Sequence, residues 1–297
     1  MGINVVELKK LTGENNSKHT ESDWIKHIVP SEARSLAEAA EREPENGVYL
    51  VARTWQAGRV LELDAHFERL EHSARTLGRT VVLPRGLIRE TIAQHLPYRD
   101  GAIRDGRFRV TAVLDDPVRI LVSIEEAHPV PAELLRVGAV CEVLRGAART
   151  NAEVKSTAWM HERIHLHGTI PEPYEYLLAD DHGFILEGAT SNFYAVLNGA
   201  LITADRGVLR GIARRIVLLV APGIVPIVLQ PVAFTDIPRL EEAFITSATR
   251  GVIPVRRIGS HDLSAPGPVT RRIAAAYDQW LETHLEPLVP SLKHEGS

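Results

Sequence analysis

Lys155 is the residue of this chain best suited to covalent chemistry. It is the one lysine between residues 27 and 292, a stretch that carries every arginine of the sequence. An arginine stays charged and unreactive, whereas a lysine can lose its proton and condense with a carbonyl compound. A codon bias towards arginine also explains the count, so a surface lysine stays open as the alternative. The surrounding motifs must decide between the two interpretations.

Three later motifs suit the binding of a phosphorylated aromatic aldehyde. Glu187 opens the run E-G-A-T-S-N, in which an acid is followed by a glycine that lets the backbone approach a flat ligand closely. Gly211 precedes an apolar helical run, whose first free N–H groups would point at an anion. Residues 246–249 add hydroxyl groups just before Gly251. Each motif also fits an ordinary turn or loop, so the argument depends on their combination.

A zinc motif overlaps the same region and offers a different chemistry. His161, Glu162 and His165 match H-E-x-x-H, which on a helix places two imidazoles on one face with the glutamate as general base. The longer form of the motif requires a third histidine where this chain has Pro171. A five-residue match of this kind also arises by chance. A zinc hydrolase is therefore the weaker alternative, and we predict no metal site.

The bulk composition excludes several classes of protein. The net charge is -4 and 24% of the residues are charged, so no basic surface for nucleic acid is expected. The single cysteine, Cys141, lies in an apolar run, which predicts a buried thiol and a reducing compartment. The first 30 residues lack the apolar centre of a secretory signal, and no run reaches the roughly 18 apolar residues of a membrane span. We expect a cytoplasmic protein that binds no membrane.

The hydrophobic periodicity predicts an α/β chain, of the α+β type, with two domains. Its 297 residues suffice for two cores. We expect an N-terminal arm at 1–30, frayed by its polar composition, a small domain at 31–126, a larger domain at 127–290 and a tail at 291–297. Helices are predicted at 66–77, 87–96, 157–166, 212–220 and 270–284, and strands at 48–51, 60–63, 107–114, 118–124, 137–144, 175–179, 191–196, 200–203, 243–246 and 251–255.

Taken in order, the motifs resemble the class IV, or fold-type IV, pyridoxal-phosphate aminotransferases. That group includes branched-chain and D-amino-acid aminotransferases and the aminodeoxychorismate lyases. The resemblance runs from about Gly47 to Val255, through G-V-Y at 47–49, an L-x-x-H-L-x-R-L-like segment at 63–70, Lys155, E-G-x-x-x-N at 187–192 and G-I-A-R at 211–214. It implies a two-domain fold-type IV architecture with the cofactor, pyridoxal 5'-phosphate, between the domains, and a homodimer.

The resemblance also implies a role for each motif. Lys155 would hold the cofactor as a Schiff base and carry a proton to and from the substrate α-carbon. Glu187 would keep the pyridine nitrogen protonated, and Tyr49 would line the substrate pocket. The phosphate would be bound by Arg69, by the backbone N–H groups of Ile212 and Ala213, and by the loop at Ser247 and Ala248.

The implied reaction moves an amino group between an amino acid and a 2-oxo acid. The nearest alternative is a lyase that eliminates pyruvate from an aminodeoxychorismate-like substrate with the same lysine and cofactor. A catalytically silent binding protein on this fold is a third hypothesis.

The chain departs from the family pattern around the substrate. Of the family's opening D-x-G-x-x-x-G-D-G only Gly47 remains, and Glu43 is among the residues that replace the rest. Leu50 and Val51 stand where branched-chain enzymes have Glu and Gly. Arg109, or failing that Arg107, is the candidate for the substrate carboxylate, because a guanidinium can hold it through two parallel hydrogen bonds. An outward-facing strand arginine is the structural alternative.

Overall fold

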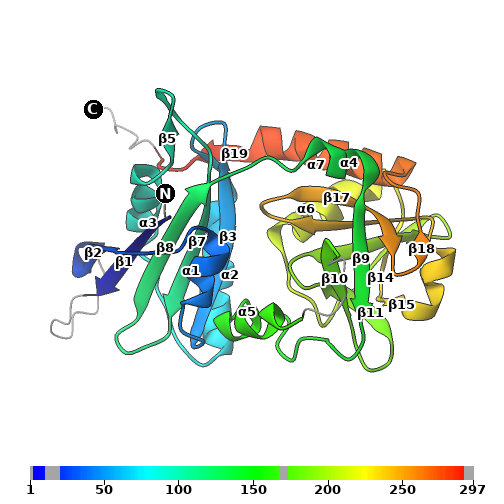
Figure 1. Ribbon diagram of the computed structural model, residues 1–297, viewed down its shortest axis with the longest axis horizontal. Helices are drawn as coiled ribbons and strands as arrows, with labels where there is room; N and C mark the ends of the chain where they lie inside the picture. The colour runs from blue at the N-terminus through cyan, green and yellow to red at the C-terminus, as the bar shows by residue number, and fades with distance from the viewer. Residues whose placement is uncertain (1–2, 11–20, 167–172, 291–297) are drawn as a thin grey trace. The chain divides into compact units, whose positions relative to one another are not determined.

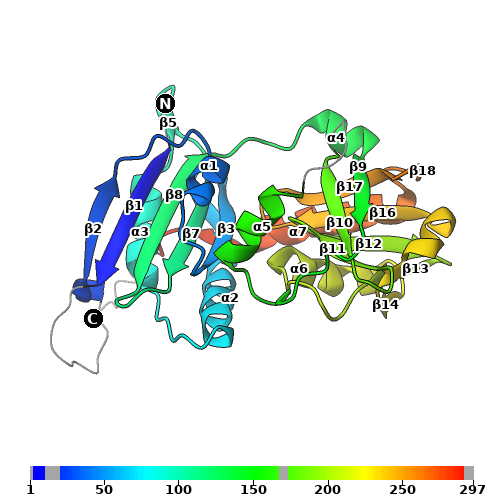
Figure 2. The same ribbon diagram turned by 60° about the horizontal axis from the view of Figure 1, so that its bottom comes forward.

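The computed structural model describes residues 3–10, 21–166 and 173–290, and the chain divides into two compact units. Among the described residues, the first unit comprises 3–10, 21–128, 154–161 and 284–290, and the second comprises 129–153 and 162–283. Each unit is built on a sheet of its own (Figures 1 and 2). The predicted boundary at 126/127 lies close to the first crossing at 128/129, but the chain then crosses again. Residues 154–161, which include Lys155, thereby belong to the first unit rather than to the predicted larger domain.

The first unit contains a seven-stranded antiparallel sheet. The predicted hairpin is present, because β3 (Gly47–Trp55) and β4 (Arg59–Leu61) pair through Thr54 and Val60. The three residues between the strands, Gln56, Ala57 and Gly58, all have positive φ. A further short hairpin pairs Tyr98–Arg99 (β5) with Ala102–Ile103 (β6). The order across the sheet is β19 (Leu285–Pro287), β4 (Arg59–Leu61), β3 (Gly47–Trp55), β7 (Gly106–Val113), β8 (Arg119–Glu126), β1 (Asn4–Lys10) and β2 (Trp24–Val29).

The expectation of a frayed N-terminal arm is wrong for residues 4–10 and 24–29, which form β1 and β2. Strand β1 pairs with β8 along its length, and Val6 and Leu8 are fully buried in the core. The polar composition misled the prediction because alternate residues of a strand face opposite sides, so lysines and glutamates can flank residues that are buried. Residues 11–20 and the predicted tail at 291–297 lie outside the described residues.

Helices cover both faces of this sheet (Figure 2). Helices α2 (Leu63–Thr76) and α3 (Arg85–Gln94) pack on the face that carries the alternating core residues of β3, β7 and β8. The short helix α1 (Leu36–Glu41) lies on the opposite face, where the N–H of Leu36 donates to Glu125 of β8. Gly78 ends α2 as predicted, with φ +75 and its N–H on the carbonyl of Arg75.

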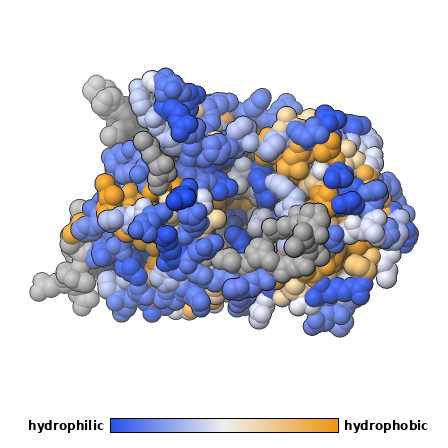
Figure 3. All heavy atoms as spheres, in the orientation of Figure 1, coloured by the Kyte–Doolittle hydropathy of each residue, from blue (hydrophilic) through white to orange (hydrophobic). Residues whose placement is uncertain are grey.

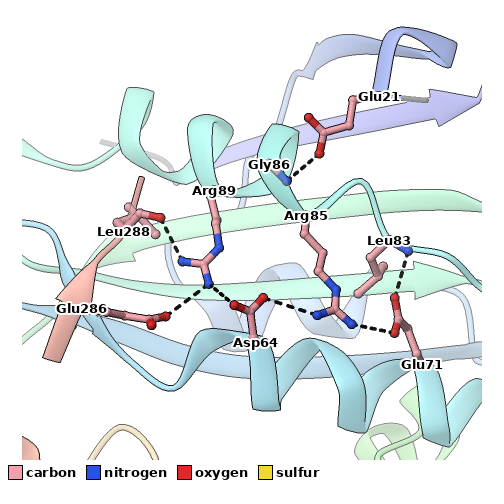
Figure 4. A network of polar contacts seen from close by, with 9 residues as sticks. All are labelled: Glu21, Asp64, Glu71, Leu83, Arg85, Gly86, Arg89, Glu286 and Leu288. Atoms are coloured by element: carbon pink, nitrogen blue, oxygen red, sulfur yellow. Dashed lines mark hydrogen bonds and ion pairs between the residues drawn. The ribbon is translucent and has the colours of Figure 1, made fainter. Parts of the chain in front are cut away.

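An arginine network attaches the C-terminal segment to the first unit (Figure 4). Arg89 of α3 is buried, and it donates to Asp64 at 3.0 Å, to Glu286 at 3.2 Å and to the carbonyl of Leu288 at 3.0 Å. Arg85, one helical turn earlier, pairs with Asp64 and with Glu71. The network explains why β19, after the long helix α7 (Pro268–His284), belongs to the N-terminal sheet.

The second unit contains a mixed ten-stranded sheet. Its strands are β14 (Ile227–Leu229), β13 (Ala200–Thr203), β12 (Asn192–Leu197), β16 (Glu242–Ser247), β17 (Gly251–Ile258), β9 (Ala139–Leu144), β10 (Glu175–Ala179), β11 (Phe184–Gly188) and β15 (Val232–Ala233) in order, with β18 (His261–Asp262) paired to β17. The remaining helical segments are α4 (Ala132–Val137), α5 (Thr157–Ile164), α6 (Ile212–Val220) and the short 3-10 turns Glu21–Asp23, Ala221–Gly223 and Phe234–Arg239. Helix α6 has the predicted bounds, whereas α4 and β11 were not predicted.

The surfaces of the two units differ in the view of Figure 3, where hydrophilic residues cover most of the first unit and hydrophobic residues form separate patches on the second. Within the described residues, no helix is long and apolar enough to cross a membrane.

Cys141 lies in the core of the second unit, as its apolar neighbours predicted. It is fully buried and belongs to the same hydrophobic cluster as Leu177, Phe193 and Ile253. Burial raises the pKa of the Cys141 thiol, and the negative charge of Glu175 raises it further. The thiol is therefore both inaccessible and protonated in the folded protein.

We expect the Cys141 thiol to react with a disulfide reagent only when the second unit opens. In native buffer its reaction should be at least about a thousandfold slower than in urea, because reaction of a buried thiol follows the free energy of opening. As Cys141 is the only cysteine, the signal has one source. Native protein that reacts as fast as free cysteine would contradict this packing.

Candidate active site

The backbone of Lys155 is held by two elements of the first unit. The N–H of Tyr49 in β3 donates to the carbonyl of Lys155 at 2.9 Å, and the N–H of Lys155 donates to Oγ of Ser73 in α2 at 3.4 Å. An isolated bridge between Val48 and Ser156 extends the contact. The Lys155 Nζ lies 5.0 Å from the centre of the Tyr49 ring, within the range of a cation–π interaction. The candidate nucleophile and the candidate pocket residue are therefore neighbours.

Gly47 is required where α5 meets β3. The Thr157 hydroxyl accepts from the N–H of Gly47 at 2.8 Å and donates to its carbonyl at 3.2 Å. A Cβ at Gly47 would stand 3.1 Å from the Thr157 methyl group and 3.2 Å from the carbonyl oxygen of Ala112. The one glycine that survives from the family's opening motif thus permits the close approach that seats the Lys155 segment.

Arg69 lies on α2 beside a neutral histidine. Its Nη2 donates to Nδ1 of His66 at 3.3 Å, because a guanidinium has no acceptor atom. Burial holds the pKa of His66 well below its usual value, and the charges of Arg69 and Lys155 lower it further. Burial also lowers the pKa of Arg69 to about 10, which still leaves it charged at neutral pH. Among the described residues no carboxylate pairs with Arg69, so this half-buried cation is suited to an external anion.

We expect His66 to make the protein lose stability as the pH falls below about 6.5. The folded-state pKa is lower than the unfolded one, so the unfolded state binds the proton first and folding is opposed by up to about 1.4 kcal/mol per pH unit. Urea unfolding at about pH 7.5 and pH 5.5 measures how far the free energy of unfolding falls between the two. This fall should be smaller in His66→Gln than in the wild type by about 1.4 kcal/mol. His72→Gln, at an exposed histidine of the same helix, is the control and should titrate like the wild type. Identical pH dependence in His66→Gln and the wild type would refute the buried neutral ring.

Arg109 does not present a free guanidinium for a substrate carboxylate, which corrects the prediction. Its Nε donates to both carboxylate oxygens of Glu43 at 3.0 Å, and its Nη2 reaches Oε2 of Glu43 at 2.6 Å. Both side chains are buried, and the Arg109 guanidinium stacks on the Tyr49 ring at 3.6 Å from its centre. The outward-facing alternative is also excluded, because Arg109 is only 2% exposed.

Glu187 is buried in β11 of the second unit, where polar contacts hold its carboxylate. Arg149 Nη1 donates to Oε1 of Glu187 at 3.1 Å, and the N–H of Leu209 donates to Oε2 at 2.9 Å. The amide of Asn192 donates to the carbonyl of Leu209 at 2.8 Å. Glu187 and Asn192, the first and last residues of the E-G-x-x-x-N motif, therefore both bind the backbone of Leu209, just before α6 begins.

Helix α6 begins at Ile212 after Gly211, which is its N-cap and has no side-chain cap. The carbonyl of Gly211 accepts the first hydrogen bond of the helix, from the N–H of Arg215. The N–H groups of Ile212 and Ala213 come before that donor in the first turn and therefore have no partner within the helix. A Cβ at Gly211 would stand 2.4 Å from the side-chain oxygen Oδ1 of Asn192, so that side chain would have to move. The geometry is that of an anion site at a helix N-terminus.

The predicted phosphate loop follows β16. Ser247 is half-buried, and its Oγ accepts from Nε of Arg250 at 2.9 Å. Arg250 also donates to the hydroxyl of Thr190 at 2.7 Å and lies 3.5 Å from Glu175. Ala248 lies in the turn between β16 and β17 and offers backbone groups alone. The Ser247 hydroxyl is therefore oriented by Arg250, a contact that the sequence did not indicate.

We expect Gly211→Ala to disturb the start of α6. The added methyl group must displace the Asn192 amide and with it the hydrogen bond to Leu209, at a cost of about 1–3 kcal/mol of unfolding free energy. Gly223→Ala is the matched control, because a Cβ there meets nothing within 4 Å. Chemical denaturation of both variants measures the difference, and equal stability of the two would contradict the close contact.

The first histidine of the H-E-x-x-H motif contacts the backbone, and the second lies beyond the end of its helix. His161 Nε2 donates to the carbonyl of Glu43 at 2.9 Å, and α5 ends at Ile164, before His165. One ring nitrogen of His161 is therefore engaged with the backbone of the first unit. Within the described residues, no group of three His, Cys, Asp or Glu side chains is arranged to hold a metal ion.

The sequence showed only part of what supports the predicted residues. His66 and Asn192 stand inside the family motifs at fixed positions, and they contact Arg69 and the carbonyl of Leu209. Arg149 and Glu43, which contact Glu187 and Arg109, were missed. These two contacts join segments far apart in the chain, which local sequence patterns do not report.

The chain belongs to the class IV aminotransferase family, whose model matches residues 47–258. It is 32% identical over 117 residues to a probable branched-chain-amino-acid aminotransferase of Thermotoga maritima, a match that covers 38% of this chain and 43% of that relative. It is 21% identical over 253 residues to a D-alanine aminotransferase of Staphylococcus epidermidis, which covers 80% of this chain and 89% of the relative. The predicted family is confirmed.

The fold matches solved aminotransferase structures. A branched-chain aminotransferase of Thermoproteus uzoniensis, solved with norvaline, has a TM-score of 0.74 and 20% identity and covers 97% of this chain and 100% of its own. A branched-chain amino acid aminotransferase of Escherichia coli has a TM-score of 0.70 and 17% identity over 84% of this chain and 92% of its own. At these identities the likeness shows the fold alone, and it confirms the predicted fold-type IV architecture.

Proposed function

We propose that this chain is a pyridoxal-phosphate-dependent aminotransferase that moves an amino group between an amino acid and a 2-oxo acid. The observation that carries the proposal is Arg69, a half-buried cation whose side chain donates to the neutral His66. It lies on the helix whose Ser73 holds the backbone of Lys155. A cation that is partly removed from water without a carboxylate partner requires an anion, and a phosphate satisfies it.

Further residues fit the phosphate and ring of the same cofactor. The uncapped first turn of α6 supplies N–H groups at Ile212 and Ala213, and the loop at Ser247 and Ala248 supplies others. At Gly211 the absence of a side chain lets Oδ1 of Asn192 lie at the place that a Cβ would take. These features support phosphate binding by backbone groups rather than by hydroxyl side chains.

Each residue has a distinct chemical task in this proposal. When bound, the cofactor would supply an electron sink for charge that develops at the substrate α-carbon. The Lys155 amine would hold the cofactor and move the proton at that carbon. Glu187, kept in place by Arg149 and by the N–H of Leu209, would accept from the protonated pyridine nitrogen. Tyr49 would form the wall of the substrate pocket nearest Lys155.

We expect the purified protein to take up pyridoxal phosphate stoichiometrically and to transfer amino groups. Borohydride treatment should fix the cofactor to the peptide that contains Lys155, and Lys155→Ala should lower the rate by at least about 10³-fold, since it removes nucleophile and proton carrier together. Peptide mass spectrometry and a coupled amino-transfer assay measure both. We also propose a homodimer on the basis of the family resemblance, which light scattering after gel filtration measures.

The control is Lys26→Ala, at a lysine of β2 whose amine donates to Gln94. It should retain both the borohydride adduct and the activity. Full activity in Lys155→Ala, or release of pyruvate from an amino substrate with no acceptor present, would contradict the proposed reaction.

A further inference from the structure

The Glu43 carboxylate is bound as a substrate carboxylate would be. It accepts from Nε and Nη2 of Arg109 and from the Thr111 hydroxyl at 2.8 Å. The carbonyl of the same residue accepts from His161 at 2.9 Å, so its backbone is fixed as well. Glu43 is 6% exposed and follows directly after α1, in the segment where the family's opening motif is absent. A carboxylate from the chain itself therefore fills a built, buried guanidinium site.

This guanidinium site lies beside the proposed reaction centre. On β3 and β7 the residues Tyr49, Arg109 and Thr111 share the face turned away from the hydrophobic core, because the core residues alternate with them. Tyr49 pairs with Thr111 across the two strands, and the Arg109 guanidinium stacks on its ring. The Lys155 amine contacts the same ring. Arg109 is thus placed where the distant carboxylate of a substrate held at Lys155 could reach it.

We infer that Glu43 determines specificity by occupying Arg109 with an internal carboxylate, so that the enzyme takes amino and 2-oxo acids with uncharged side chains and rejects dicarboxylic ones. The inference rests on the proposed aminotransferase function. A second acidic group would have to displace a carboxylate that is already held by four hydrogen bonds in a buried position. If it did not displace Glu43, it would lie beside a like charge, which is itself a means of discrimination.

The inference is tested first by opening the site and offering a small carboxylate. In Glu43→Ala the Arg109 guanidinium loses its partner and gains the space of the removed side chain. We expect acetate to raise the melting temperature of this variant saturably, by several degrees beyond its effect on the wild type. The double variant Glu43→Ala/Arg109→Leu should show no such gain, since the cation is gone.

Glu7→Ala is the matched control. Glu7 is a buried carboxylate of β1 that pairs with Arg119 in the same sheet. Its removal should destabilise the protein without creating saturable stabilisation by acetate, because Arg119 keeps its second partner, Asp115. Comparison at equal concentrations of sodium chloride removes the effect of ionic strength.

The second test compares amino acceptors. In the wild type kcat/KM should be at least tenfold higher for pyruvate than for 2-oxoglutarate. Glu43→Ala should shift this ratio at least tenfold towards 2-oxoglutarate, mainly through a lower KM. Glu43→Gln keeps the volume but removes the charge, and we expect a shift of at least threefold in the same direction; it serves as the test if Glu43→Ala does not fold.

The outcomes separate this inference from the proposed function. An unchanged acceptor ratio in the Glu43 variants, with or without stabilisation by acetate, overturns the specificity role. A wild type that prefers 2-oxoglutarate overturns it as well. A protein with no amino transfer to any acceptor refutes the proposed function instead, while saturable stabilisation of Glu43→Ala by acetate, absent from the double variant, still shows that Glu43 fills a carboxylate site.

Discussion

The hydrogen bond from the N–H of Tyr49 to the carbonyl of Lys155 is the constraint on which the candidate site depends. It joins the one reactive amine of the central sequence to β3, a strand that lies more than a hundred residues earlier in the chain. Two further hydrogen bonds complete the attachment. The N–H of Gly47 donates to the Thr157 hydroxyl, and the N–H of Lys155 donates to the Ser73 hydroxyl. The Lys155 segment is thereby part of the N-terminal unit, and its position relative to Tyr49 and Arg69 is set by backbone contacts rather than by a loop.

Three buried or half-buried arginines show how charge distinguishes scaffold from ligand site. Arg109 is neutralised by Glu43 and Arg149 by Glu187, so each forms an internal pair whose loss would leave a buried charge uncompensated. Arg69 instead has the neutral ring of His66 beside it. The same residue type therefore serves packing in two places and remains available to an anion in the third. The sequence around Arg109 and Arg149 does not indicate their carboxylate partners, which come from distant segments of the chain.

The sequence predicted features that depend on neighbouring residues. The hairpin of β3 and β4, the end of α2 at Gly78 and the bounds of α6 each follow from local turn chemistry or helical periodicity, and the structure confirms them. The family was also predictable, because its motifs keep their order and spacing.

Features that depend on distant partners were missed. The strand β1 was hidden by its polar residues, since the strand becomes recognisable only beside β8. The pairing of Glu43 with Arg109 joins residues 66 positions apart. No local pattern marks either contact, so the Glu43 partner of Arg109 was missed for the same reason as the strand β1.

A crystal structure of the protein grown with pyridoxal phosphate tests the central claim most directly. The account expects continuous density from Nζ of Lys155 to the cofactor, with the phosphate in contact with the Arg69 guanidinium and the N–H groups of Ile212 and Ala213. Glu43 should remain on Arg109 in the same crystal. A cofactor phosphate bound away from Arg69, or an unmodified Lys155 beside a bound cofactor, would contradict it.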